Sequence, residues 1–191
     1  MAAKSSLKNM LLCLTAVCLF CSGILGVVYA VTYNPILDAS HKALVASISE
    51  VLPEGGEISE ALSADSFEYY TSTKDGEVLA YAVKSCTIGF GGPLTVMVGV
   101  LPDGTVYATK VLSHSETPGL GAKCQSDEHF LSQFRGFPAD KKLAVTKDGG
   151  DVDAITASTI TSRAYTLAVA NAVELVKGMA ATNEEGGNDN E

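Results

Sequence analysis

The hydrophobic pattern divides the chain near residue 34. Residues 10–33 form a continuous, uncharged and mostly apolar run that is long enough to cross the hydrocarbon core of a bilayer as one helix. Lys4 and Lys8 precede this run. By the positive-inside rule, they predict a cytoplasmic N-terminus at residues 1–9, a retained transmembrane helix at residues 10–33 and an extracytoplasmic domain over residues 34–182.

A cleaved signal peptide is the alternative interpretation of the apolar run. Residues 28–30 form an acceptable small-residue cleavage site, although the run is longer than a usual signal sequence. Lipid attachment at Cys21 is disfavoured because the bulky Phe20 directly precedes it. Cys86 and Cys124 fall in the exported part, where disulfides are permitted, and the sequence leaves open whether they pair.

Extended runs separated by turn residues predict two β-hairpins in the exported part. The first hairpin spans residues 67–85 and turns at Lys74-Asp75-Gly76. The second joins strands at residues 94–101 and 105–112 through Pro102-Asp103-Gly104. Both patterns indicate antiparallel pairing.

Helical spacing of apolar residues predicts a short helix at residues 38–52 and a weak one at residues 126–134. A longer amphipathic helix is predicted at residues 161–179. Its expected inner face consists of Ala164, Leu167, Ala168, Ala172, Leu175, Val176 and Met179.

Two further segments complete the outline. Residues 141–146 predict another short strand, and the polar, acidic residues 183–191 predict a flexible tail. The sum is an α+β chain, in which one N-terminal transmembrane helix precedes an antiparallel-sheet domain with a C-terminal helix.

Charge separates the two parts further. The chain has 22 acidic and 13 basic residues and a net charge of −9. All the acidic residues and 11 of the basic ones follow residue 33, so the exported part carries −11. This balance argues against a nucleic-acid binder. The chain also lacks a nicotinamide fingerprint and a cysteine cluster for an iron–sulfur centre.

The first segment with candidate chemistry follows the second hairpin and reads HSETPGLG over residues 114–121. A proline and two glycines allow the backbone to approach a planar ligand closely, and polar side chains flank them. An ordinary connecting loop is the alternative. The candidate ligand contacts are His114, Glu116, Thr117, Gly119, Leu120 and Gly121.

The second candidate segment, residues 151–163, reads DVDAITASTITSR and precedes the last helix. A helix N-terminus presents unpaired N–H groups and the positive end of the helix dipole, which favour a phosphate. A cluster of helix caps is the alternative, since serine and threonine are common caps. The candidate hydroxyls belong to Thr156, Ser158, Thr159, Thr161 and Ser162.

Taken together with GFGGPLTVMVGV at residues 89–100, these two motifs resemble the FMN-binding domain family. The similarity is greatest to the G subunit of Rnf-type ion-translocating electron-transport complexes. It extends over nearly the whole chain. The C subunit of the sodium-pumping NADH:quinone reductase shares the domain and is an alternative, although it is usually longer.

The resemblance implies FMN attached covalently through its phosphate to Thr159. The family pattern is an Asp, two residues, Ser or Thr, Gly, Ala and then the acceptor Thr, and here it begins at Asp153. Ala157 stands where the family has Gly, and Ser158 stands where it has Ala. Attachment at Ser158, attachment at Thr156 and no attachment are the alternatives.

The resemblance also implies a function in the plasma membrane. The chain would relay electrons within a complex that couples electron flow between ferredoxin and NAD to Na⁺ or H⁺ movement. Its expected partners are the other membrane subunits and a flavin transferase. A flavin-free assembly or binding module and a free-standing periplasmic flavoprotein are the competing hypotheses. The coupling ion, the flavin potential and the neighbouring electron carriers stay open.

Overall fold

The computed structural model describes residues 7–185, and the chain divides into two compact units, residues 1–43 and 44–191. The first described element is the long helix α1 (Leu7–Val51). Within residues 7–37 its large apolar side chains are exposed. Among the described residues, α1 is the one helix that is long and apolar enough to cross a membrane.

The structure joins two helices that the sequence pattern separated. Residues 10–33 and 38–52 were predicted as distinct segments, but α1 continues through both and includes Pro35. Proline lacks the N–H that would bond to the carbonyl four residues earlier. The loss of one hydrogen bond does not end this helix, and the physical break comes only at Leu52-Pro53.

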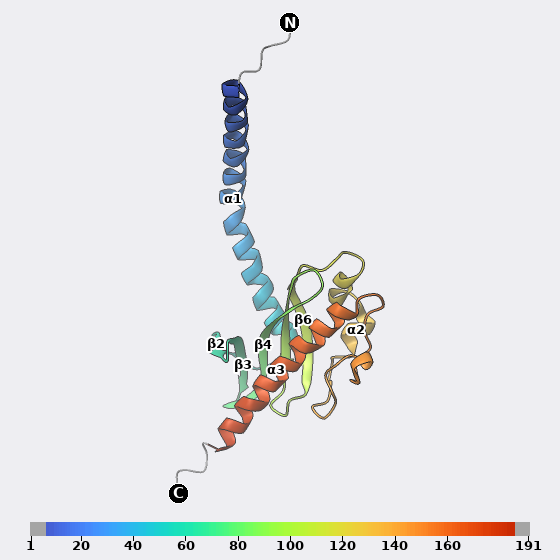
Figure 1. Cartoon of the computed structure of the whole chain (residues 1–191). Coiled ribbons are helices and arrows are strands. Elements are labelled where there is room, and N and C mark those ends of the chain that lie inside the picture. The colour runs from blue at the N-terminus through green and yellow to red at the C-terminus, as the bar shows by residue number, and fades with distance from the viewer. Residues whose placement is uncertain (1–6, 186–191) are drawn as a thin grey trace. The chain divides into compact units, whose positions relative to one another are not determined.

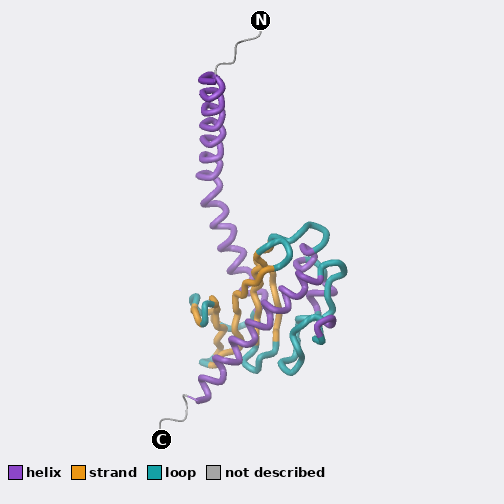
Figure 2. The backbone as a smooth tube through the Cα atoms, viewed as in Figure 1, coloured by secondary structure: helices purple, strands orange, loops and turns teal. Residues whose placement is uncertain are grey.

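The second unit is built on one antiparallel sheet (Figures 1 and 2). Within the described residues its strands lie in the order β1-β3-β4-β5-β6, and β2 pairs with β3. The strands are β1 (Glu57–Ile58), β2 (Leu62–Ala64), β3 (Phe67–Lys74), β4 (Glu77–Ile88), β5 (Pro93–Val100) and β6 (Val106–His114).

Both predicted hairpins are confirmed. β3 and β4 meet at a tight turn in which Asp75 and Gly76 both have positive φ, as the type I′ hairpin turn requires. β5 and β6 pair on either side of Pro102-Asp103-Gly104. The very short strands β1 and β2 carried no sequence signal of their own.

The C-terminal helix α3 (Thr159–Glu185) crosses one face of the sheet and packs on β4 and β5 (Figure 1). Tyr165 lies at the centre of this core and contacts the rings of Phe130 and Phe134. Its hydroxyl group is hydrogen-bonded to Thr109 Oγ1 at 2.7 Å. Apolar burial on this face therefore fixes where the helix lies on the sheet.

The opposite face of the sheet is covered by the end of α1 that belongs to the second unit. Ile48, Val51 and Leu52 pack there against Met97 of β5. Gly99 lies directly beneath this contact, and a Cβ atom at that position would overlap the carbonyl of Val51. The glycine is thus required by the close approach of helix and strand.

Between β6 and α3 the chain forms short helical turns, which are η1 (Gly121–Gln125), α2 (Glu128–Ser132) and η2 (Thr146–Asp148). The α2 helix falls within the predicted residues 126–134. The strand predicted at residues 141–146 was wrong. Val145 is buried, as the pattern suggested, but its backbone pairs only through one isolated parallel bridge to Val152. A single bridge does not make a strand.

Two other expectations need correction. Leu167 was assigned to the inner face of the last helix but is 53% exposed, because Ala164, Ala168 and Val169 form the stripe that contacts the sheet. The tail predicted at residues 183–191 overlaps the last helix, since α3 continues to Glu185. Residues 186–191 lie outside the described part.

The two cysteines of the second unit are free thiols. Cys86 is exposed and Cys124 is buried, so the open question of their pairing is answered in the negative. Burial raises the pKa of the Cys124 thiol to about 11. Cys124 therefore stays protonated at neutral pH, whereas Cys86 presents an accessible sulfur.

Replacing Tyr165 tests the packing of α3. Tyr165→Phe should lower the free energy of unfolding by about 1 kcal/mol, because it removes one buried hydrogen bond. Tyr165→Ala should lower it by about 3–5 kcal/mol, because it also opens a cavity. Denaturant unfolding of the full chain in detergent measures both changes. Tyr107→Phe, on the exposed side of β6, should have no effect. Equal stability of Tyr165→Phe and the unaltered chain would contradict the prediction.

Candidate functional site

The candidate site forms where three segments meet around the carboxylate of Glu116. One oxygen of this carboxylate accepts a hydrogen bond from the backbone N–H of Phe90 at 2.8 Å. The other accepts one from the Thr161 hydroxyl at 2.9 Å. Glu116 is only 5% exposed. It therefore joins the loop after β4, the loop after β6 and the first turn of α3.

Glycines make room for this carboxylate. A Cβ atom on Gly89 or on Gly121 would overlap the oxygens of Glu116. Gly91 lies just as close to the backbone of Ser115. The GFGG and HSETPGLG segments thus fit against each other through the absence of side chains.

His114 supports the same loop from the other side. Its Nδ1 accepts a hydrogen bond from the backbone N–H of Glu116 at 3.2 Å, and its Nε2 lies 3.0 Å from the side-chain oxygen of Gln125. These contacts orient the loop. They leave His114 outside the residues that line the pocket described below.

The chain enters α3 through a tight turn that Ser162 closes. The Ser162 hydroxyl accepts a hydrogen bond from the Ile155 N–H at 2.9 Å and donates one to the Ser158 carbonyl at 3.0 Å. Ala157 takes a left-handed conformation within this turn, with φ of +61°. The sequence departure from Gly to Ala therefore falls at a position where glycine would be unstrained.

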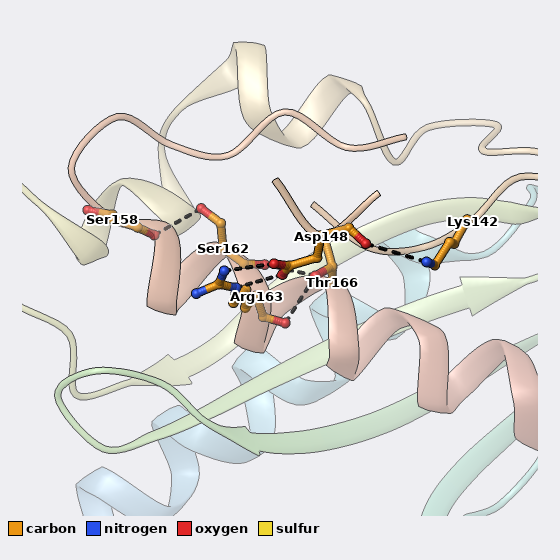
Figure 3. A network of polar contacts seen from close by, with 6 residues as sticks. All are labelled: Lys142, Asp148, Ser158, Ser162, Arg163 and Thr166. Carbon is orange, nitrogen blue, oxygen red and sulfur yellow. Dashed lines mark hydrogen bonds and ion pairs between the residues drawn. The ribbon is translucent and has the colours of Figure 1, made fainter. Parts of the chain in front are cut away.

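An ion pair fixes the neighbouring loop to the first turn of α3 (Figure 3). Arg163 donates two hydrogen bonds to the carboxylate of Asp148, at 2.6 and 2.7 Å. These bonds hold the pKa of Asp148 below its usual value and raise that of Arg163. Lys142 Nζ also donates to the Asp148 carbonyl at 3.4 Å. The charged groups are exposed, so they orient the loop more than they stabilise the fold.

A pocket of about 350 Å³ opens between these segments. Exposed apolar side chains of Phe90, Leu120 and Ile160 lie at it, and Phe90 is 69% exposed. Serine and threonine residues and the first turn of α3 also line it. The full lining is Phe90, Glu116, Thr117, Leu120, Gly121, Ala157, Ser158, Thr159, Ile160 and Thr161.

The structure brings seven of the predicted site residues to this pocket, from two segments of the chain. They are Glu116, Thr117, Leu120, Gly121, Ser158, Thr159 and Thr161. The other four, His114, Gly119, Thr156 and Ser162, do not line it. Thr156 and Gly119 are exposed, whereas Ser162 is fully buried in the turn.

Sequence reasoning missed Phe90, Ala157 and Ile160 as lining residues. Phe90 could have been predicted as a pocket residue, because a large aromatic residue flanked by glycines is rarely part of a hydrophobic core. Ile160 gave no comparable signal. Its exposure follows from the start of α3 at Thr159, which is two residues earlier than predicted.

Comparison with known proteins identifies the family. Over 185 residues, the chain is 31% identical to the G subunit of the ion-translocating oxidoreductase complex of Shewanella piezotolerans, and the alignment covers 87% of each chain. The chain belongs to this family of G subunits.

Further relatives agree with this assignment. Over 166 residues, the chain is 34% identical to the G subunit of the proton-translocating ferredoxin:NAD(+) oxidoreductase complex of Clostridium ljungdahlii. That alignment covers 85% of this chain and 88% of the relative. The FMN-binding domain family matches residues 89–174, a range that contains every residue lining the pocket.

A more distant match is a solved structure from Parabacteroides distasonis, that of the C subunit of the Na(+)-translocating NADH-quinone reductase. It is 22% identical, with a TM-score of 0.45, over 68% of this chain and 80% of that chain. This similarity is too low to bear on the function of the present G-subunit family member.

Because Ala157 has a left-handed conformation, its replacement by glycine should change the stability of the fold. Ala157→Gly should raise the free energy of unfolding by about 0.5–1 kcal/mol, because glycine adopts positive φ without steric cost. Denaturant unfolding of the full chain measures the change. The matched control is Ala170→Gly inside α3, which should lower stability by about 1 kcal/mol. Loss of stability in both variants would show that residue 157 is not strained.

Proposed function

We propose that this chain is a membrane-anchored electron-transfer subunit of an ion-translocating oxidoreductase complex and that it carries FMN on Thr159. The observation that carries the proposal is the position of Thr159. This residue lines a pocket with exposed apolar side chains, at the N-terminus of α3, within the range matched by the FMN-binding domain.

The residues present suit the two ends of FMN. The N-terminus of α3 favours the phosphate, since its first N–H groups are unpaired and the helix dipole is positive there. Phe90, Leu120 and Ile160 offer apolar surface for the isoalloxazine ring. When bound, FMN supplies the electron-transfer chemistry. The chain supplies the binding, the orientation and the local polarity.

The burial of the hydroxyls favours Thr159 as the covalent acceptor. A phosphoester bond at this residue requires that its hydroxyl be reached by a separate flavin transferase. Thr159 is half-buried and lines the pocket, whereas Ser158 and Thr161 are buried. Thr156 is exposed but lies outside the pocket lining. Thr159 therefore combines access with the right surroundings.

The membrane topology of the proposal places the N-terminus in the cytoplasm and the FMN-binding unit outside. The basic residues Lys4 and Lys8 before the apolar part of α1 support this orientation. The partners would be other membrane subunits of the complex. Ferredoxin and NAD as the terminal redox pair are inferred from the names of relatives such as that of Clostridium ljungdahlii.

A flavin-free assembly module is the second candidate. The strained Ala157 favours it, because the family glycine would adopt this turn more easily. The turn nevertheless forms, with Ser162 closing it. The flavoprotein is therefore the better supported of the two.

Covalent attachment is tested by co-expressing the chain with a flavin transferase. The unaltered protein should give a fluorescent band on a denaturing gel under ultraviolet light, and Thr159→Ala should abolish it. Thr156→Ala should keep the band, because its hydroxyl does not line the pocket. Mass spectrometry of the tryptic peptide 148–163 would then localise the FMN mass. A dark band from the unaltered protein would favour the flavin-free module.

The orientation is tested at Cys86, the exposed thiol of the second unit. A membrane-impermeant maleimide added to spheroplasts should label the protein, and Cys86→Ser should remove the label. Cys124 should react only after denaturation, because it is buried. Labelling of Cys86 only after the membrane is permeabilised would reverse the proposed topology.

A further inference from the structure

Four exposed side chains form an apolar patch at and beside the pocket. They are Ile88, Phe90, Leu120 and Ile160, which are 73%, 69%, 47% and 51% exposed. Phe90, Leu120 and Ile160 line the pocket, whereas Ile88 ends β4 and lies outside the lining. Ile88 and Phe90 are the two most exposed large apolar side chains in the described residues 44–185. Apolar side chains gathered in this way are typical of a surface that contacts a partner or a membrane.

The segments that carry the apolar patch have no charged residue. Residues 87–96, 117–122 and 154–162 contain neither an acidic nor a basic side chain, although the chain after residue 33 has a net charge of −11. The turns at the opposite end of the sheet differ. They carry Lys74 and Asp75 between β3 and β4, and Asp103 between β5 and β6. The second unit therefore has one apolar end and one charged end.

The chain enters the second unit from the apolar end. Ile88 pairs with Pro93, so the loop after β4 leaves the sheet at the start of β5. Val51, the last residue of α1, lies against Gly99, near the other end of β5. The residues of α1 that precede Val51 in this unit run back along the sheet toward the loop after β4 (Figure 1). The apolar patch and the point of entry are thus at the same end of the sheet.

The length of the connection keeps this end near the bilayer. Only residues 34–43 separate the apolar run at 10–33 from the second unit. These ten residues span about 15 Å as the helix that they form, and at most about 36 Å if fully extended. The anchor thus gives the second unit a high effective concentration at the membrane surface, so that even weak contacts with lipid are populated.

We propose that the apolar patch docks on the lipid bilayer, with the Ile88 and Phe90 side chains inserted into the interfacial region. The acidic second unit gains no electrostatic attraction to anionic lipids, so burial of apolar side chains supplies the contact. Four side chains offer less surface than the roughly 800 Å² per partner of a stable protein interface, which favours lipid as the occupant. The docking goes beyond the proposed function and does not require FMN. If FMN is bound, docking holds it at the level of the membrane subunits.

The test uses single-tryptophan variants of the full chain, because the natural sequence has no tryptophan. Unmodified Ile88→Trp is reconstituted in phosphatidylcholine vesicles with or without bromine on the acyl chains near the headgroups. Brominated lipid should quench its emission, because the indole lies in the interfacial region. The matched control is Val78→Trp, which is also exposed on β4 but lies about 33 Å away at the charged end, so its emission should be unchanged. Both variants should melt like the unaltered protein.

The remaining outcomes decide between the occupants. Equal emission of Ile88→Trp in brominated and plain vesicles would overturn the docking, and so would equal quenching of the two variants. Shielding of Ile88→Trp only after the other membrane subunits are added would assign the patch to a protein partner instead. High salt should leave the quenching intact, and its loss there would show that charge holds the unit in place. Quenching in a chain that never acquires flavin would support the docking and refute the proposed function alone.

Discussion

A buried carboxylate needs hydrogen-bond donors, and Glu116 finds them in two segments far from it in the sequence. The Phe90 N–H and the Thr161 hydroxyl satisfy one oxygen each, so the loop after β4 and the start of α3 are both tied to the loop after β6. The glycines at 89 and 121 follow from this requirement, because a side chain at either position would displace the carboxylate. The pocket exists where these bonds hold the segments together.

The helix α3 links this site to the core. Further along, Tyr165, Ala168 and Val169 are fully buried against the sheet, so the helix cannot shift without loss of packing. Its first turn extends beyond that core and lines the pocket. The pair of Arg163 and Asp148 holds the adjoining loop to the same turn. A site at the end of a core helix therefore inherits its rigidity, whereas a site on a free loop would not.

Much of the fold could be predicted from local patterns, and the failures have physical causes. The hairpins were found because their turn residues adopt positive φ cheaply. The strands β1 and β2 are too short to show periodicity, and they depend on pairing with β3. Val145 is buried and pairs with Val152 through one bridge, so its apolar surroundings in the sequence resemble those of a strand although no strand forms. Leu167 lies on the exposed side of α3, because Tyr165, Ala168 and Val169 occupy the side that is buried in the core.

The candidate site was predicted as two segments but not as a set of side chains. Five hydroxyls in one short stretch look equivalent in the sequence, but in the fold they differ in burial and in hydrogen bonding. Ser162 and Thr161 are used within the fold, and Thr156 is exposed. Two hydroxyls then remain at the pocket, one half-buried on Thr159 and one buried and unpaired on Ser158. Of these two residues, Thr159 is the more exposed, and this difference in burial is why the proposed function places the acceptor there.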